Sequence, residues 1–380
     1  MVYLKIYDRH NIDELQWNVF SNGEYAQAYL SDLIRNGVQA YISNVDTEMM
    51  VLAVDDILIP ITINNTEYDN SYVCSPYTHY VSCGIEETQL MENRFLRFFL
   101  KVIFIALSGL LKWGQVNKVV SVNNWLLPTN LYPPITSEQI SSISEFLKNR
   151  FPHHAIQFRS LNSRTNDIQL KALIANHYHD IMSRQIFFLD AKLSHPFKAN
   201  MFKKDLQLLQ RSPYTVVELP HKGQNQTKRL SDLYREIYLK KYTMHNPQYS
   251  EKFIDLAIEK KLLTMKALIH NGKIDGVYGY VKMNDVMTMP FFGYDTSLPT
   301  ETGLYRKISA LLALDAKEQG LMMNLSAGAS SFKRLRRAEP HLEYNAVYLK
   351  HLSLRRQIAW LVLKGIVNPF GKRILKKLRL

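Results

Sequence analysis

One stretch near the end of the chain, NLSAGASSFKRLRRAEP, combines small residues with a burst of positive charge. The small side chains at 326–331 would let the backbone approach a large ligand closely. Phe332 and Lys333 follow at once, and arginines come directly after them. A lysine held over a carbonyl group can stabilise the negative charge that develops on its oxygen during acyl transfer. Acyl transfer is thus one chemistry that these residues could perform, whereas the charge pattern alone favours a solvated helix start.

Acyl transfer to an amine also needs a base that takes a proton from the amine. Asp295 follows the aromatic run FFGY and is the first candidate, with Tyr294 beside it for hydrogen bonding. His245 and Asn246, in MHNPQY, are the second. Each pair also suits a plain turn, because Asp and Asn-Pro are common where a chain reverses. Both interpretations stay open.

A third set of polar side chains lies in SYVCSPYTHYVSC, among the β-rich segments of the first half. Its density of hydroxyl groups is typical of a surface that recognises an acceptor, with Tyr77 and His79 as binding residues. Cys74 lacks neighbours that would lower the pKa of its thiol, so we expect a buried, unreactive cysteine. Cys74, His79 and Cys83 lack a fourth ligand at the spacing that zinc requires, and we expect no metal.

Positive charge gathers at the C-terminal end of the chain. The net charge is +13, from 47 Lys and Arg against 34 Asp and Glu, and no acidic residue follows Glu343. The cations in this region are Lys350, Arg355, Arg356, Lys364, Lys372, Arg373, Lys376, Lys377 and Arg379. Such an excess indicates an anionic partner, whether a membrane, a nucleic acid or a phosphorylated ligand.

The C-terminal segment itself is amphipathic and is divided at Asn368-Pro369 and Gly371. We expect two short helices that hold the protein peripherally on an anionic membrane surface. The alternative is that Trp360 and Leu363 pack back on the second domain and the remainder is a solvated tail.

The location that the composition predicts is the cytoplasm. Two cysteines exclude a disulfide scaffold, and residues 1–17 are charged without the apolar core of a secretory leader. The most apolar run, Phe98 to Trp113, contains Lys101 and Lys112 and is shorter than the roughly 20 residues that span a bilayer. It predicts a buried helix within a longer helical stretch, 86–113.

The length of 380 residues predicts two domains. In the second half, a basic helix at 197–212 precedes a strand, two helices, a meander turned at NGK and MND, a helix ending near Gly320, and the strand LMMN. In the first half, TSEQISSISEFLKNRF predicts a capped helix and HAIQFRSLN a strand. The order is that of an α+β fold.

The ordered set in the second half resembles the GNAT-related acyltransferases of the Fem peptidyltransferase type. The resemblance rests on HPFKANMFKKDLQLL, GKIDGVYGYVKMNDVMTMPFFGYDT, TGLYRKISALLALDAKEQGL and SAGASSFKRLRRAEP. It implies two GNAT-like domains in tandem, each a mixed, mainly antiparallel sheet flanked by helices. The expected limits are 1–165 and 166–350, with a basic tail at 351–380.

The resemblance implies an N-acyltransferase with Lys333, Phe332 and Asp295 as catalytic residues. The residues expected to bind the acceptor are Tyr294, Tyr280, His245, Asn246, Tyr77 and His79. The residues expected to bind the donor phosphates are Arg334, Arg336, Tyr305 and Gly303. The amine acceptor would be a small molecule or a precursor, such as one of the cell envelope or of a natural product.

The donor is the part that departs from the family pattern. PTETGLY has one glycine and Glu301 where simple acetyl-CoA-dependent members have a glycine-rich pyrophosphate loop. We expect no tightly bound cofactor. Acyl-CoA is the expected co-substrate, in preference to aminoacyl-tRNA. If the donor were aminoacyl-tRNA, tRNA would be a partner. The competing hypothesis is a non-catalytic protein that binds nucleic acid or an anionic membrane.

Overall fold

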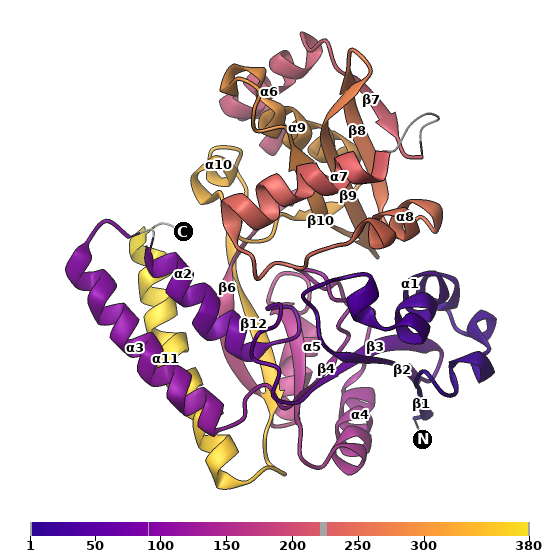
Figure 1. The fold of residues 1–380 in the computed structure, drawn as a ribbon, viewed down its shortest axis with the longest axis vertical. Helices are drawn as coiled ribbons and strands as arrows, with labels where there is room; N and C mark the ends of the chain where they lie inside the picture. Colours follow the sequence, from indigo (N-terminus) through magenta and orange to yellow (C-terminus); the bar gives the residue numbers. More distant parts are fainter. Residues whose placement is uncertain (1, 90, 221–225, 379–380) are drawn as a thin grey trace. The chain divides into compact units, whose positions relative to one another are not determined.

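Most of the strands and helices that the residue pattern predicts are present, in an α+β structure (Figure 1). The computed structural model describes residues 2–89, 91–220 and 226–378. The chain divides into two units. Unit 1 comprises Met1–Ser183, His245–Gln248 and Glu343–Ile374, and unit 2 comprises Arg184–Met244, Tyr249–Leu342 and Leu375–Leu380.

These limits differ from the expected boundaries after residues 165 and 350. The reason is that β6 (His179–Asp190) and β12 (Glu339–Tyr348) each begin in one unit and end in the other. Residues 343–374, expected to be divided between the second domain and a tail, therefore belong to unit 1.

In unit 1 the strands follow the order β1-β2-β3-β4-β5-β12. Neighbouring strands are antiparallel except for the parallel pair β4–β5. The strands that lie wholly in this unit are β1 (Leu4–Tyr7), β2 (Glu48–Val54), β3 (Ile57–Asn64), β4 (Val119–Val122) and β5 (Ala155–Asn162).

In unit 2 the order is β7-β8-β9-β10-β11-β6, with β10–β11 as the parallel pair. The strands that lie wholly in this unit are β7 (Thr215–Glu218), β8 (Thr264–His270), β9 (Lys273–Met283), β10 (Val286–Tyr294) and β11 (Met322–Asn324). Both units thus repeat one pattern. Three antiparallel pairings are followed by one parallel pairing, and the last strand is again antiparallel to its neighbour. The expected fold class, two α+β domains with mixed, mainly antiparallel sheets, is confirmed.

Helices flank the sheet in each unit. Unit 1 contains α1 (Gly23–Asn36), α2 (Cys83–Gln89), α3 (Arg94–Trp113), α4 (Ser137–Arg150), α5 (Asp167–Ala175) and α11 (Leu354–Leu378) as far as Ile374. Unit 2 contains α6 (Asn200–Gln210), α7 (Gln226–Tyr234), α8 (Glu251–Glu259), α9 (Leu304–Glu318) and α10 (Ser330–Arg334). In each parallel pair a helix connects the two strands, α4 in unit 1 and α9 in unit 2, as parallel strands require.

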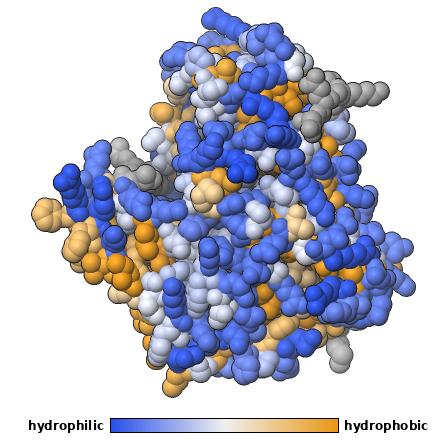
Figure 2. All heavy atoms as spheres, in the orientation of Figure 1, coloured by the Kyte–Doolittle hydropathy of each residue, from blue (hydrophilic) through white to orange (hydrophobic). Residues whose placement is uncertain are grey.

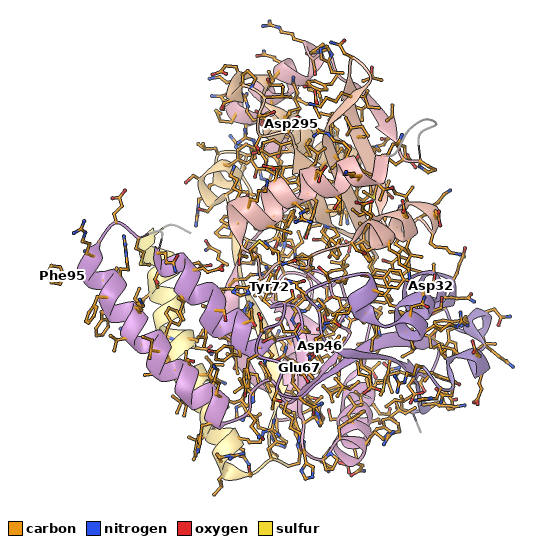
Figure 3. All side chains as sticks on the ribbon, viewed as in Figure 1. Asp32, Asp46, Glu67, Tyr72, Phe95 and Asp295 are labelled. Atoms are coloured by element: carbon orange, nitrogen blue, oxygen red, sulfur yellow. The ribbon has the colours of Figure 1, made fainter. Side chains whose placement is uncertain are left out.

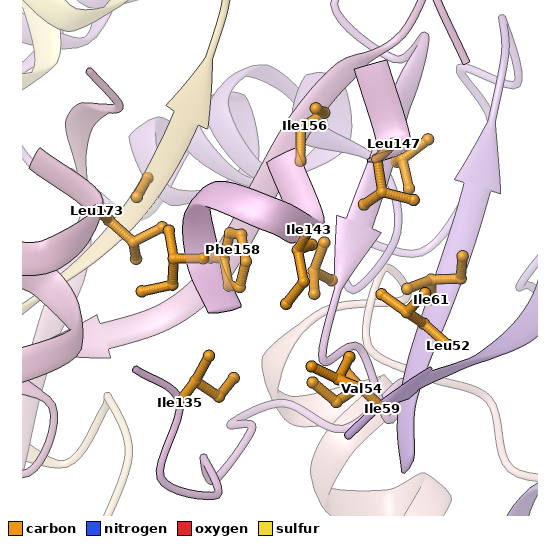
Figure 4. Close-up of a cluster of buried hydrophobic side chains, with 14 of the residues drawn as sticks. Leu52, Val54, Ile59, Ile61, Ile135, Ile143, Leu147, Ile156, Phe158 and Leu173 are labelled. Carbon is orange, nitrogen blue, oxygen red and sulfur yellow. The ribbon is translucent and has the colours of Figure 1, made fainter. Parts of the chain in front are cut away.

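The core of unit 1 forms where α4 and α5 cover one face of its sheet. Ile143 and Leu147 of α4 meet Ile61 of β3 and Phe158 of β5 in this cluster (Figure 4). The start of α4 is the predicted capping box: Gln139 N–H donates to the Thr136 hydroxyl (3.1 Å), and Thr136 N–H donates to the Gln139 side chain (2.9 Å). In unit 2, residues of α6 and α9 pack on β8, β9 and β10 in the same manner.

Residues 71–81, expected to be rich in β structure, form turns and then the start of a helical segment. A π-helical turn, Thr78–Ser82, leads into α2. Thr78 N–H donates to Ser75 Oγ (3.0 Å) and Tyr77 N–H donates to Asn117 Oδ1 (2.9 Å), so polar side chains cap the first turn. The prediction of β structure in this segment failed because one of the residues that cap the helical turn, Asn117, is distant in the sequence.

The expected helix at 86–113 is divided into α2 and α3, and Asn93 caps the start of α3. The expectation that its apolar run is buried is wrong, since Phe98 and Phe99 are 70% and 61% exposed. None of the helices in the described part of the chain is long and apolar enough to cross a membrane.

The two short C-terminal helices are likewise corrected to one, because α11 continues through Pro369 to Leu378. Trp360 and Leu363 are fully buried, in the core of unit 1 rather than on the second domain. The side chains of residues 370–372 and 374–380, at the end of the expected membrane-binding tail, lie outside the described part of the structure.

Candidate functional site

The parallel strands of unit 2 stay together for only a short distance. β11 pairs with β10 at Val286–Thr288, whereas β10 continues to Tyr294. Beyond Asn324 the chain follows β6: Leu325 N–H donates to the Phe187 carbonyl (2.8 Å), and Phe187 N–H donates to the Ser326 carbonyl (3.2 Å). Among the described strands, none therefore pairs with this side of β10 over Met289–Tyr294. An extended ligand could hydrogen-bond to this backbone edge.

The loop after β11 is held in an uncommon backbone conformation. Ser326, Gly328 and Ala329 all have positive φ, at 56°, 76° and 45°. Left-handed backbone is costly for serine and alanine, so the surrounding contacts must impose it. The small residues that stand out in the sequence thus build a tight turn before α10.

Lys333 supplies the contacts that impose this conformation. Its Nζ donates hydrogen bonds to the carbonyl oxygens of Leu325 (2.7 Å), Ser326 (3.1 Å) and Ala327 (2.7 Å). An ammonium group has three N–H donors, so all of them are used. Burial, helped by the charge of Arg184, lowers the pKa of Lys333 to about 7, whereas the three carbonyl acceptors favour its protonated form.

An aromatic cluster lies beside this loop. The ring of Phe332 lies 4.5 Å from that of Tyr305, and Tyr305 lies 6.4 Å from Tyr294, between ring centroids. All three rings are half-buried, and they come from α10, the start of α9 and the end of β10. Lys241 Nζ donates to the Tyr294 hydroxyl (3.2 Å). The structure therefore brings together three residues that the sequence analysis selected separately.

Asp295 lies at the end of β10 (Figure 3), within a group of hydrogen-bond donors. It accepts hydrogen bonds from Arg229 (2.7 Å), Lys273 (2.9 Å) and both the backbone N–H and the hydroxyl of Ser297. Burial alone would raise its pKa, but these donors hold the pKa well below the usual value. A carboxylate so strongly stabilised as an anion is a weak base. Its contacts are those of an anchor for the end of β10.

The expected phosphate-binding arginines have different surroundings. Arg336 is buried, and its Nε lies 2.5 Å from Asp205 Oδ2, while Arg306 Nε lies 2.6 Å from Asp205 Oδ1. The Arg336 guanidinium also covers the ring of Phe332, 3.3 Å from its centroid. Arg334 is exposed at the end of α10. Arg336 thus fixes the position of Phe332, whereas the guanidinium of the exposed Arg334 lies 5.4 Å from the ring centroid of Phe187.

Gly303 immediately precedes α9 and has left-handed backbone, with φ of 66°. The positive end of the α9 dipole lies there, which favours an anionic group. The exposed Glu301 lies two residues before it and opposes that preference. Tyr280 is buried in the core of unit 2, where its hydroxyl accepts a hydrogen bond from Gln319 (3.1 Å).

The other expected acceptor-binding residues belong to unit 1. The His245 carbonyl accepts from the Ser71 hydroxyl (2.8 Å), and the Asn246 carbonyl accepts from Asn44 Nδ2 (2.9 Å). His79 Nε2 lies 2.9 Å from the Ser183 hydroxyl, and its ring packs on Tyr80 at 4.7 Å. The remaining residue, Tyr77, has its hydroxyl 2.7 Å from that of Ser108 in α3. Their part in acceptor binding stays a prediction.

Cys74 is buried, and its thiol donates to Asn70 Oδ1 (3.0 Å). Burial raises the pKa of this thiol far above its usual value, which makes it a poor nucleophile. Among the described residues, no group of three or more His, Cys, Asp or Glu side chains is placed to hold a metal ion.

A row of buried polar residues in unit 1 was missed. Thr62, Ser121 and Gln157 are register partners on β3, β4 and β5. Ser121 Oγ and Gln157 Oε1 have no hydrogen-bonding partner among the described residues. Next to the row, the buried Arg159 donates to the Val73 carbonyl (2.6 Å) and to Asn124 (2.9 Å). Gln157 and Arg159, two positions apart in the otherwise apolar first part of this strand, were the available indication.

The chain matches no family model and no curated protein. Its likenesses are to solved structures. The structure of L-PGS from Bacillus licheniformis is 15% identical, with 60% of this chain and 78% of that chain covered, and a TM-score of 0.44. FemX is 7% identical over 60% and 79%, with a TM-score of 0.46. A tandem GNAT protein from the clavulanic acid biosynthesis pathway is 8% identical over 92% and 98%, with a TM-score of 0.40. All three TM-scores lie below 0.5, and a shared fold does not by itself define a function.

Proposed function

We propose that this protein is an N-acyltransferase that moves an acyl or aminoacyl group from an activated donor to an amine, with its chemistry in unit 2. The observation that carries the proposal is the split between β10 and β11, bordered by Phe332 and Lys333. It combines an unpaired strand edge, an aromatic wall and a buried cation within one unit. Together these can hold an extended donor and stabilise the developing charge.

In the proposed reaction the lone pair of the amine forms the new C–N bond at the donor carbonyl carbon. The carbonyl π electrons move to the oxygen, and their return breaks the C–S bond of acyl-CoA or the C–O bond of an aminoacyl ester. The proton lost by the amine ends on the leaving sulfur or oxygen. We assign Lys333 to the oxyanion, which its Nζ reaches by exchanging one loop carbonyl for the substrate oxygen.

The remaining unit 2 residues would position the donor. Phe332 and Tyr305 form the wall along which the acyl chain lies, and Arg336 holds Phe332 in place. Phosphate groups of the donor would meet exposed Arg334 and the helix end at Gly303. We propose acyl-CoA as the first donor to test and aminoacyl-tRNA as the second, with an amine of a small molecule or precursor as acceptor.

The test is a screen for amide products by mass spectrometry, with acetyl-CoA, a long-chain acyl-CoA and mixed aminoacyl-tRNA as donors. Once a product is found, Lys333→Ala should lower turnover by on the order of 10²-fold. Lys192→Ala is the matched control, because Lys192 is an exposed lysine of unit 2 whose side chain pairs with Asp285 at the surface. Wild-type turnover in a folded Lys333→Ala variant, or no amide from any donor, would count against the proposal.

A further inference from the structure

α3 exposes an apolar stripe along its length. Leu107 and Leu111 are buried in the core of unit 1, and Phe104 and Leu110 pack against it. The other side of the helix presents large apolar side chains to solvent: Phe95 (89% exposed), Phe98 (70%), Phe99 (61%), Val102 (49%), Ile105 (58%) and Trp113 (49%). At 3.6 residues per turn, these six positions fall on one side of an α-helix. Phe95 points outward from α3 (Figure 3).

α11 adds a second stripe next to the first. Leu354, Ile358, Leu361 and Val362 are exposed at i, i+4, i+7 and i+8, while Trp360 between them is buried. The two helices lie side by side (Figure 1) and contribute to the same core cluster. Figure 2 shows apolar side chains gathered over α3. These ten exposed side chains of the two helices are named the α3–α11 face.

Cations border this face. Arg94, Lys101 and Lys112 are exposed, and at 3.6 residues per turn they project along one edge of the α3 stripe. At the other helix, the Arg355 guanidinium lies 5.9 Å from the ring centroid of Trp113. Neither helix contains an Asp or Glu residue in its sequence. The face therefore combines apolar area with positive charge alone.

We propose that the α3–α11 face docks unit 1 on the surface of an anionic lipid bilayer, with α3 in the plane of the interface. Phenylalanine side chains would enter the acyl region, the cations would meet lipid phosphates, and Trp113 would lie at the boundary between them. A second copy of this chain is a poorer occupant, because a two-fold contact would bring identical cationic edges together. This proposal assigns a lipid membrane as the partner of unit 1 and does not depend on the acyl transfer proposed above.

Flotation of the full chain with vesicles of equal parts phosphatidylcholine and phosphatidylglycerol tests the docking. The wild type should float, and Phe95→Ser with Phe98→Ser should lower the partition coefficient by on the order of tenfold. The control is Val19→Ser with Ile168→Ser, since these residues of unit 1 are 62% and 78% exposed away from the face. The control variant should float like the wild type.

Trp113 offers a direct readout of contact with lipid. The chain has 4 tryptophans, and Trp17, Trp125 and Trp360 are buried while Trp113 is half exposed. On docking, tryptophan emission should shift to shorter wavelength and brominated lipid should quench it. Trp113→Phe should remove both changes.

Deleting residues 371–380 separates the face from the C-terminal cations. Binding through exposed charges weakens as salt is raised, whereas binding through apolar side chains persists, so the truncated chain should still float at high salt. The proposal is overturned if the Phe95/Phe98 variant floats unchanged, if Trp113 emission is unaffected by vesicles, or if the intact chain self-associates through this face and ignores vesicles. None of these experiments measures acyl transfer. Their results therefore test membrane docking even if the proposed acyltransferase function is wrong.

Discussion

The ammonium group of Lys333 donates all three of its hydrogen bonds to backbone carbonyl oxygens. The carbonyls that it binds belong to a loop in which Ser326 and Ala329 have left-handed φ, and these contacts compensate for the cost of that geometry. An exposed helix start, the simpler interpretation of KRLRR, does not describe a side chain that is 7% exposed. When it is protonated, its ammonium group is consequently held in a buried site, where its charge acts with little screening.

The protonation of Lys333 predicts how activity depends on pH. Burial lowers its pKa to about 7, so the protonated form that can donate to an oxyanion is present below that pH and is lost above it. We expect kcat to fall as pH rises through about 7. Lys333→Arg keeps its charge over the whole range, so its profile should lack this fall. The measurement is the pH profile of kcat for the wild type and for Lys333→Arg, with folding checked by circular dichroism. If kcat of Lys333→Arg falls in the same way, the fall is due to the titration of another group.

At the scale of elements, β10 is the strand on which the candidate site depends. One edge pairs with β9, the other leaves β11 after Thr288, and its end is anchored through Asp295. It also lies very close to α7. A Cβ atom on Gly293 would be 2.5 Å from the Leu233 carbonyl oxygen and 2.7 Å from Tyr234 N. Only glycine fits this approach, because backbone atoms cannot move aside as side chains do.

Gly293→Ala should therefore destabilise the protein by about 1–3 kcal/mol, through overpacking of β10 against α7. Gly109→Ala is a control of opposite sign: apart from the backbone of α3 itself, no described atom lies within 4 Å of the Cβ position of this helix residue, and alanine is the better helix former. It should stabilise by roughly 0.5–1 kcal/mol. Urea unfolding of the two variants measures both changes, and an unchanged midpoint for Gly293→Ala would show that the strand and helix separate easily.

At the scale of the molecule, each unit is completed by chain from the other half of the sequence. In unit 1, β12 pairs with β5, and Val347, Leu349, Trp360 and Leu363 join the core that α3 covers. In unit 2, β11 pairs with the end of β6, a strand that begins in unit 1. A division of the chain at residue 165 therefore removes α5, β12 and α11 from unit 1.

A fragment of residues 1–165 should consequently fail to fold, because it exposes the β5 edge and the apolar surface that β12 and α11 bury. Residues 1–183 joined to 343–374 by a glycine-serine linker restore these contacts and should fold. Thermal unfolding followed by circular dichroism distinguishes the two chains. A cooperative transition in the 1–165 fragment would contradict the dependence on β12.

What the sequence by itself determined is local. The capping box at Thr136 and Gln139, the meander of β8, β9 and β10, and helix α9 all depend on residues a few positions apart, whose propensities act without help from the rest of the chain. The length of the chain and the order of these elements were sufficient to predict two α+β domains.

Only the tertiary structure decided how distant segments complete one another. The repeated strand order of the two units, the pairing of Asp205 with Arg306 and Arg336, and the exposed side of α3 have no local pattern. An apolar run predicts burial because most apolar faces find a partner within the fold, but which face does so is set by packing between residues hundreds of positions apart. One side of α3 packs in the core cluster that includes residues of α11, and the other side faces solvent. The same apolar residue types therefore occur in both the core and the surface of this helix.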